Sequence, residues 1–448
     1  MSAALEDGSR VGIIGGGPAG SLFAQFLLSF AQRIDLDLAV DIYEPRDFAK
    51  PGPAGCNMCG GIVSESLVQA LAIEGITLPS AVVQRGIDSY VLHTDAETLR
   101  IDTPLQEKRI AALHRGGGPR DVKDIKWGGL DGYLLTLARS LGANVVAARV
   151  GEVGWDGGRP QVRLPARAET YDLLVGATGV NSSGWQLFET LGLPSKRCET
   201  TKAYITELNL GSEVITRHFG NSMHMFLLNI PRLDCAAIIP KGDYLTVCLL
   251  GRDIDAELIK TFFQNPAVER CFPEAWNVAE GACHCSPKIN VREASRPFMD
   301  RLVLLGDCGA TRLYKDGIGA AYRTAKAAAR TAVFSGVSAE DFQRHYWPVY
   351  RSIAVDNRFG RLIFATVHWI KAVRPLLGGV MRMSAREQTD PDAARRMSIV
   401  LWDMFTGSAP YREIFVRTLD PRFLGRFTWE SARAAVGRHH ARGKPLHG

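Results

Sequence analysis

Residues 11–20 restrict the fold of this chain more than any other stretch. A short apolar run leads into three glycines at the spacing G-x-G-x-x-G, namely Gly15, Gly17 and Gly20. The run predicts a buried parallel strand. The glycines allow a tight turn, the close approach of a pyrophosphate to the backbone, and the packing of the next helix on the strand. Pro18 suits the first turn of that helix, because this position needs no N–H donor.

An acidic residue completes the pattern. Residues 38–43 predict a second strand, and Glu44 follows it, 24 positions after Gly20. A carboxylate at this place accepts hydrogen bonds from the hydroxyls of an adenosine ribose. The other interpretation is an ordinary strand–helix turn with an acid at the surface. Because strand, glycines, helix and acid occur in the expected order, the sequence predicts dinucleotide binding.

Composition places the chain among globular proteins of the cell interior. Its 448 residues are enough for two or three domains with cores of their own. The acidic first residues contain no apolar segment typical of a secretory signal, and no run reaches the roughly 18 apolar residues of a membrane span. The nine cysteines are scattered, which favours a reducing compartment. We therefore expect a cytoplasmic protein.

The net charge of +6 comes from the C-terminal part of the chain. From position 351 onward there are 17 basic and 8 acidic residues. Two apolar runs in this part, 362–370 and 399–405, contain tryptophan, and arginines flank the first of them. Such helices suit peripheral contact with an anionic membrane, here the inner face, or a cover over a substrate domain. No nucleic-acid partner is expected.

The order of the elements predicts an α/β fold with a divided nucleotide domain. Further buried strands are expected at 144–150, 173–176 and 302–305, and helices at 64–72, 130–141 and 317–332. Between them, 202–250 is rich in predicted strands, with a hairpin around 241–243. The predicted domains are a Rossmann-like part (8–80, 105–182 and 290–335), an inserted mixed or antiparallel sheet for the substrate (81–104 and 183–289), and a helical basic region (336–448).

The order of these motifs resembles the para-hydroxybenzoate hydroxylase-like flavoproteins. The resemblance rests on the glycine fingerprint, the helix at 130, the turn at 177–179 and the motif Gly306-Asp307. Two further stretches resemble geranylgeranyl reductases. These are Cys59-Gly60-Gly61, in residues 59–64, and Pro240-Lys241-Gly242-Asp243, in residues 239–243. The resemblance covers about residues 8 to 360.

The resemblance implies one FAD in an extended pose. The pyrophosphate would lie at the glycine loop, the ribose at Glu44, the ribityl chain or pyrophosphate at Asp307, and the isoalloxazine at the helix that starts at residue 317. A helix N-terminus there favours the negative charge of reduced flavin. No metal is implied. The cofactor-binding residues implied by the resemblance are Gly15, Gly17, Pro18, Ala19, Gly20, Glu44, Val150, Gly306, Asp307, Gly317, Ile318 and Gly319.

The activity implied by the resemblance is the reduction of carbon–carbon double bonds in a polyprenyl or other apolar, lipid-like substrate by hydride transfer from reduced flavin. Such a reaction also needs a proton donor, for which Cys59 and Tyr314 are the candidates. A packed cysteine and a packed or capping tyrosine are the alternatives. Cys56 and Cys59 could also form a redox dithiol, or join Cys283 and Cys285 in a metal site. The electron donor (NADPH, ferredoxin or a quinol) stays open.

Several residues that are typical of other flavin enzymes are missing from this sequence. A flavin-dependent monooxygenase that hydroxylates or epoxidises an apolar substrate is the alternative function, but Thr178 stands where the hydroxylases usually have aspartate. The arginine that often precedes the helix at 130 is also missing. Residues 235–240 lack both tryptophans of the halogenase motif Trp-x-Trp-x-Ile-Pro, which argues against halogenation. A membrane-associated protein that keeps a flavin fold only for structure is the non-catalytic reading.

Overall fold

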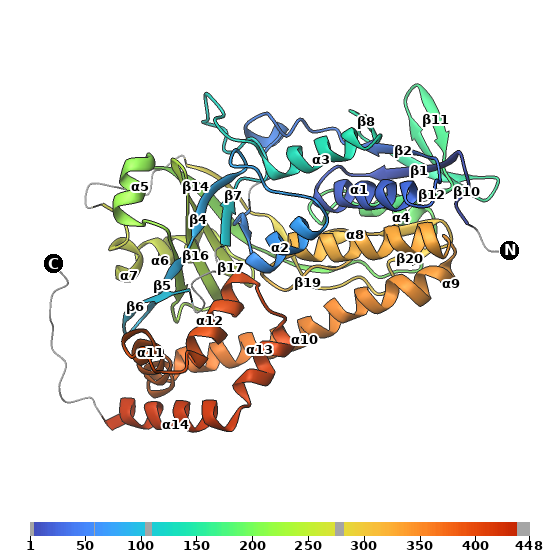
Figure 1. The fold of residues 1–448 in the computed structure, drawn as a ribbon. Helices are drawn as coiled ribbons and strands as arrows, with labels where there is room; N and C mark the ends of the chain where they lie inside the picture. Colours follow the sequence, from blue (N-terminus) through green and yellow to red (C-terminus); the bar gives the residue numbers. More distant parts are fainter. Residues whose placement is uncertain (1–3, 58, 104–109, 274–281, 437–448) are drawn as a thin grey trace.

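A computed structural model describes residues 4–57, 59–103, 110–273 and 282–436 of the chain. Helices and sheets form an upper part around the N-terminal sheet, a second large sheet beside it, and a group of C-terminal helices below both (Figure 1). Within the described residues, no helix combines the length and the hydropathy that a bilayer crossing needs.

A six-stranded sheet carries the glycine loop. Its order is β20-β21-β12-β1-β2-β8, and all neighbours are parallel except β20 and β21. The strands are β1 (Ser9–Ile14), β2 (Leu38–Tyr43), β8 (Asn144–Val146), β12 (Leu173–Gly176), β20 (Phe298–Met299) and β21 (Leu302–Leu304). The expected strand at 144–150 is therefore too long, because the chain leaves the sheet after Val146.

Helices cover one face of this sheet, and a small meander lies over the other. On the first face, α1 (Pro18–Gln32) contacts both α3 (Leu130–Ser140) and α8 (Gly317–Phe334). The alanines of α8 allow its close approach to α1, and both helices bury their apolar sides in one core. The opposite face packs on α4 (Trp185–Thr190) and the meander β9 (Glu152–Asp156), β10 (Arg159–Leu164) and β11 (Arg167–Thr170).

A second large sheet, of seven described strands, has the order β18-β14-β17-β16-β15-β5-β6. Its long hairpin turns at Gly242, as the sequence predicts. The strands are β5 (Ser89–Thr94), β6 (Thr98–Asp102), β14 (Tyr204–Asn209), β15 (Ser222–Leu227), β16 (Leu233–Lys241), β17 (Tyr244–Gly251) and β18 (Cys283–Cys285). Short helices interrupt this strand-rich region and cover one face of the sheet: α5 (Ser212–His218), α6 (Ala256–Phe263) and α7 (Pro266–Glu269).

Smaller elements join the two large sheets. A three-stranded sheet holds β3 (Ile62–Val63), β7 (Ile110–Leu113) and β4 (Val83–Ile87), and α2 (Glu65–Ile73) follows β3. A two-stranded ribbon pairs β13 (Glu199–Lys202) with β19 (Lys288–Arg292). The turns η1 (Gly52–Ala54) and η2 (Gly306–Cys308) lie in loops. The domain boundaries inferred from the sequence stay a prediction.

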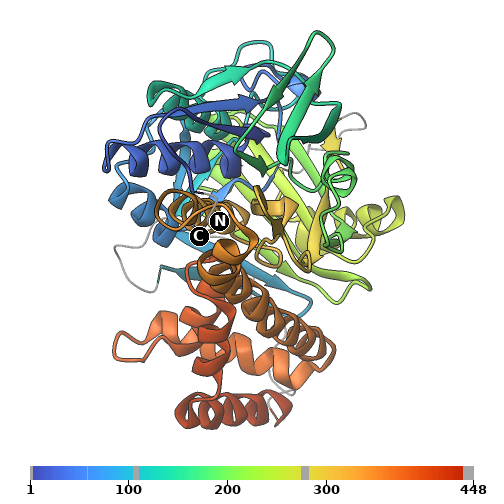
Figure 2. The same ribbon diagram turned by 90° about the vertical axis from the view of Figure 1, so that its right-hand side faces the viewer.

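The C-terminal helices pack on the second face of the seven-stranded sheet. The 26-residue helix α10 (Trp347–Ala372) runs obliquely below α8 (Figure 1), and the helices that follow it in the chain gather beside its C-terminal half (Figure 2). Trp402 is fully buried in the core between these helices and the sheet. The remaining elements are α9 (Ala339–Asp341), η3 (Phe342–Tyr346), α11 (Arg374–Thr389), α12 (Arg396–Thr406), α13 (Tyr411–Thr418) and α14 (Pro421–Val436).

Candidate functional site

The three fingerprint glycines have different surroundings. A Cβ at Gly15, which has φ +110°, would lie 2.4 Å from the carbonyl oxygen of Ala177, and a Cβ at Gly20 would lie 1.9 Å from that of Gly15. A Cβ at Gly17 would have no neighbour nearer than the Arg115 guanidinium, at 3.8 Å. Gly15 and Gly20 therefore permit the strand–turn–helix itself, whereas Gly17 faces open space at the N-cap of α1.

The Glu44 carboxylate lies buried beside this turn. One of its oxygens accepts the Gly16 N–H at 2.9 Å, and the other accepts the backbone N–H and the Nε–H of Arg46 at 3.0 and 3.2 Å. These bonds fix the carboxylate at the C-terminal edge of the parallel sheet, next to the N-terminus of α1. In open α/β sheets, ligands bind at this edge.

An arginine that the sequence analysis did not assign extends the polar edge. The Nε and Nη2 atoms of Arg115 donate to the two oxygens of the fully buried Asp131, at 2.9 and 2.7 Å. Burial alone would lower the pKa of Arg115, but the Asp131 carboxylate raises it, so the guanidinium stays charged. Asn57 donates to Asp131 and accepts from Arg46, which links this pair to Glu44. Arg115 thus supplies a cation near the loop, where the expected arginine before α3 is missing.

The Gly306-Asp307 turn meets the glycine loop from the other side. A Cβ at Gly306 would lie 2.8 Å from the Cβ of Ala19, so a glycine lets this turn pack on α1. Burial raises the pKa of Asp307, although the Arg115 charge acts to lower it. A Cβ at Gly317 would lie 3.8 Å from an Asp307 oxygen. The fold therefore brings the glycine loop, the Gly306-Asp307 turn and the start of α8 close together.

The first turn of α8 has a side-chain cap. Asp316, with φ +52°, accepts the Gly319 N–H at 3.1 Å. This bond leaves the N–H groups of Gly317 and Ile318 as the first-turn donors that can face a ligand. Val150 is buried in the apolar core that also contains Ile14, Tyr43 and Cys308, and its contact with a cofactor stays a prediction.

The loop before α8 is held by the C-terminal helices. The Arg312 guanidinium donates to the carbonyls of Gly407 and Ala409, at 3.1 and 2.6 Å, and bonds to Asp316 at 2.8 Å. The Lys315 ammonium donates to the carbonyl of Asp403 at 2.8 Å. These contacts connect the helical region to the loop that positions the start of α8.

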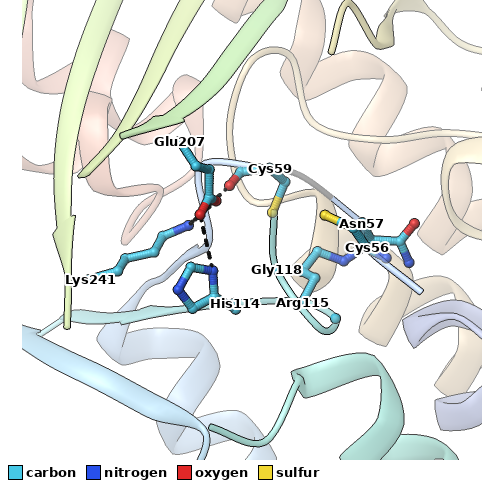
Figure 3. A pocket seen from close by; sticks show the side chains of 9 residues that line it. Cys56, Asn57, Cys59, His114, Arg115, Gly118, Glu207 and Lys241 are labelled. Carbon is cyan, nitrogen blue, oxygen red and sulfur yellow. Dashed lines mark hydrogen bonds and ion pairs between the residues drawn. The ribbon is translucent and has the colours of Figure 1, made fainter. Parts of the chain in front are cut away.

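A buried charge cluster brings together the two short motifs that resemble geranylgeranyl reductases (Figure 3). The Lys241 ammonium lies 3.7 Å from a Glu207 oxygen and donates to the carbonyl of Cys59 at 3.1 Å. The other Glu207 oxygen lies 3.4 Å from Nδ1 of His114. Lys241, Glu207 and His114 are only 1%, 4% and 3% exposed.

A glycine allows this contact between the motifs. A Cβ at Gly61 would lie 2.7 Å from the Lys241 nitrogen and 2.0 Å from the carbonyl oxygen of Leu113. The Cys59 sulfur accepts the Gly61 N–H at 3.1 Å and is turned toward Arg115 and Gly118 (Figure 3). Both motifs therefore border one small recess between Cys56, Cys59, Arg115 and the charge cluster.

The ionisation of the cluster follows from its burial. Desolvation acts to raise the pKa of Glu207, but Lys241 and His114 lower it to about 2. Burial lowers the pKa of His114, so its imidazole is neutral near pH 7. The ring also stacks on Trp127, with 4.4 Å between the ring centroids. With Nδ1 directed at Glu207, Nε2 of His114 is buried without a hydrogen-bond partner among the described residues.

This ionisation predicts a stability that depends on pH. Folded Glu207 keeps its charge to about pH 2, whereas its ordinary pKa is 4.5, so its contribution is complete above pH 4.5 and is lost as the pH falls toward 2. Across this window, we expect the free energy of unfolding of the wild type, measured with urea, to fall by on the order of 3 kcal/mol more than that of Glu207→Gln. If the free energy of unfolding fell equally with pH in the two proteins, the ion pair would be contradicted.

The structure separates the two candidate proton donors. Cys59 lines the recess, whereas the Tyr314 hydroxyl donates to Asp234 at 2.8 Å and its ring packs edge-on against Phe364. Burial and Asp234 raise the pKa of Tyr314. Both residues border the core between the seven-stranded sheet and the C-terminal helices. All nine cysteines are free thiols, and burial raises the pKa of Cys56 to about 12.

The geometry does not support a metal site formed by the four cysteines considered above. Among the described residues, the three-residue group whose ligand atoms lie near enough to hold a metal does not include Cys56, Cys59, Cys283 or Cys285.

Sequence reasoning missed Arg115, Asp131 and Glu207. For Arg115, a signal was present in the glycine-rich loop that it begins. Glu207 stands in an ordinary strand, without a local pattern.

The fold is similar to that of several solved structures. No protein-family model and no curated protein sequence matches the chain. A geranylgeranyl bacteriochlorophyll reductase-like protein from Thermoplasma acidophilum has a TM-score of 0.63 at 14% identity, over 95% of this chain and all of the other. The flavin-dependent brominase Bmp2 has 0.60 at 13%, over 96% and 98% of the two chains. A variant of the halogenase PltM, solved in complex with FAD, has a TM-score of 0.58 at 16% identity, over 98% of this chain and 93% of the other.

At these identities the likeness concerns the fold. The α/β class, the Rossmann-like core, the additional sheets and the C-terminal helices agree with the architecture expected from the sequence. The chain therefore shares its three-dimensional fold, over nearly its whole length, with a reductase-like protein and with flavin-dependent halogenating enzymes.

Proposed function

We propose that this protein is an FAD-dependent oxidoreductase that reduces carbon–carbon double bonds of a polyprenyl or similarly apolar substrate. FAD is the cofactor named for one structural neighbour, and the residues around the glycine loop suit it. Gly17 leaves backbone N–H groups open to a pyrophosphate, Arg115 adds a positive charge, and Glu44 offers acceptors to ribose hydroxyls. The N–H groups of Gly317 and Ile318 would face the isoalloxazine.

The convergence of Cys59 and Lys241 carries the proposal of alkene reduction. Bound FAD supplies the reducing equivalents, and the chain must add a proton to the other carbon of the double bond. The Cys59 sulfur lines the recess, accepts the Gly61 N–H and is turned toward Arg115 (Figure 3), so its S–H group is the candidate donor. Lys241 fixes the Cys59 carbonyl, so its role is positioning.

An apolar core lies to one side of Cys59. Cys59, Ile62 and Tyr314 adjoin this core, which lies between the seven-stranded sheet and the C-terminal helices. The recess itself has a polar lining that includes Arg115, Glu207 and Lys241, so the proposal places the hydrocarbon chain of the substrate on the apolar side of Cys59. The Tyr314 hydroxyl is already paired with Asp234, so Cys59 is the better proton donor.

The test is anaerobic mixing of chemically reduced, FAD-loaded protein with geranylgeraniol in detergent. We expect the absorbance of oxidised flavin to return and the product to gain two hydrogens. Cys59→Ser should retain FAD but react about 10²–10⁴ times more slowly, whereas Cys283→Ser, which alters a thiol in β18, should react like the wild type. Absence of anaerobic reoxidation, with oxygen-dependent insertion of an oxygen atom, would instead establish the monooxygenase.

We also propose that the basic helical region contacts an anionic membrane. Trp369 in α10 and Trp429 in α14 are each 60% exposed, and basic residues are in excess in this part of the chain. Exposed tryptophans beside arginines suit the interface of a bilayer. The fraction of protein that sediments with vesicles rich in anionic lipid should be smaller for the double variant Trp369→Ala, Trp429→Ala than for the wild type. Equal sedimentation of both proteins would contradict this contact.

A further inference from the structure

Three potential metal ligands meet on the side of the seven-stranded sheet that α5, α6 and α7 cover. His93 belongs to β5, His224 to the adjacent β15, and Cys271 follows α7. They are 5%, 8% and 9% exposed. Cys59 borders the core on the other face of this sheet, so the group lies apart from the recess.

The ligand atoms of this group lie at short range. Nε2 of His93 is 3.0 Å from Nδ1 of His224 and 3.6 Å from the Cys271 sulfur, and all three atoms lie within 4.8 Å of one another. Two imidazole nitrogens and one sulfur are ligands typical of zinc.

We propose that His93, His224 and Cys271 bind a divalent ion of the zinc class. With Zn–N near 2.0–2.1 Å and Zn–S near 2.3 Å, tetrahedral angles separate two nitrogens by about 3.3 Å and a nitrogen from a sulfur by about 3.6 Å. The separations of 3.0 and 3.6 Å around His93 lie within a few tenths of an ångström of these values, and Nδ1 of His224 lies within 4.8 Å of the Cys271 sulfur. A fourth position remains for a water molecule or another ligand.

The thiolate, rather than the thiol, is the form of cysteine that binds zinc. The ion therefore binds as the Cys271 S–H bond breaks, the S–Zn bond forms and one proton leaves to solvent; no electron is transferred.

Neighbouring residues hold the ligands in place. Nδ1 of His93 lies 3.2 Å from the Thr98 hydroxyl, a contact that orients the ring and leaves Nε2 toward the group. Phe226 stacks on His93 at 4.5 Å, and Phe219 packs on His224 at 4.9 Å. An ion bound there would tie the segment after α7 to β5 and β15.

The experiment uses the tag-free, FAD-loaded full chain after treatment with a chelator. Zn²⁺ is titrated in competition with a chromophoric chelator, and proton release is followed in weak buffer. We expect one Zn²⁺ per chain, release of one proton, and the visible bands of thiolate-bound tetrahedral Co²⁺ when Co²⁺ replaces Zn²⁺. Cys271→Ala should weaken Zn²⁺ binding by at least about 100-fold.

A matched variant separates metal binding from folding. Cys235→Ala also removes a buried thiol, but outside the group, and should bind Zn²⁺ like the wild type. Thermal unfolding without metal establishes that both variants are folded. The proposal is overturned if folded wild type shows no saturable Zn²⁺ binding, or if Cys271→Ala and Cys235→Ala bind Zn²⁺ equally. Cys59 plays no part in this assay, so failure of alkene reduction leaves the result unaffected.

Discussion

Lys241→Met should lower the free energy of unfolding by about 3–5 kcal/mol, because it removes one partner of a buried ion pair. Methionine keeps the apolar stem, but among the described residues Glu207 is then left with His114 and the hydroxyl of Thr246 as its partners. The carbonyl of Cys59 also loses its donor. Urea unfolding at neutral pH measures the change.

A second substitution distinguishes loss of the ion pair from loss of packing. Adding Glu207→Gln to Lys241→Met removes the unpaired charge, and we expect the double variant to recover more than half of the lost free energy. Lys202→Met, at an exposed position of β13, should change it by less than about 0.5 kcal/mol. A change below about 1 kcal/mol for Lys241→Met would contradict the buried pair.

Gly20→Ala should lower the free energy of unfolding by about 3 kcal/mol, because the new methyl group would lie 1.9 Å from the carbonyl oxygen of Gly15. That oxygen belongs to the backbone, so α1 must move away from β1 to admit it. Thermal unfolding of the apoprotein measures the effect without any contribution from a ligand.

The matched variant is Gly17→Ala, which places the same methyl group in open space at the N-cap of the same helix. Its unfolding should differ from that of the wild type by less than about 1 kcal/mol, the usual cost of alanine in place of glycine at an N-cap. Equal destabilisation by the two substitutions would show that the structure assigns these glycines incorrectly.

Local patterns were sufficient to predict much of the fold. The glycine spacing indicates β1 and α1 because it expresses a local steric requirement, and Pro18 indeed begins α1. Alternation and turn residues indicate the β16–β17 hairpin for the same reason. The end of β8 at Val146 was missed because the departure of a chain from a sheet depends on its neighbours rather than on its own pattern.

The charge cluster shows what local patterns leave open. Cys59 and Lys241 stand in recognisable motifs, but their contact joins residues 182 positions apart. Glu207 lies in a strand without a motif and becomes informative only when the fold buries it between Lys241 and His114. The Arg115–Asp131 pair was missed similarly, because side-chain pairing depends on where the fold places the loop before α3.

The central claim is that the glycine loop, Glu44 and Asp307 together hold one FAD. Fluorescence titration of folded apoprotein with FAD tests it most directly. We predict saturation at one FAD per chain. Gly17→Val should weaken binding at least about tenfold, because its side chain would occupy the path of the pyrophosphate, and Gly425→Ala, at an open position of α14, should bind like the wild type. Folded wild-type apoprotein without saturable FAD binding, or with affinity unchanged by Gly17→Val, would contradict the account.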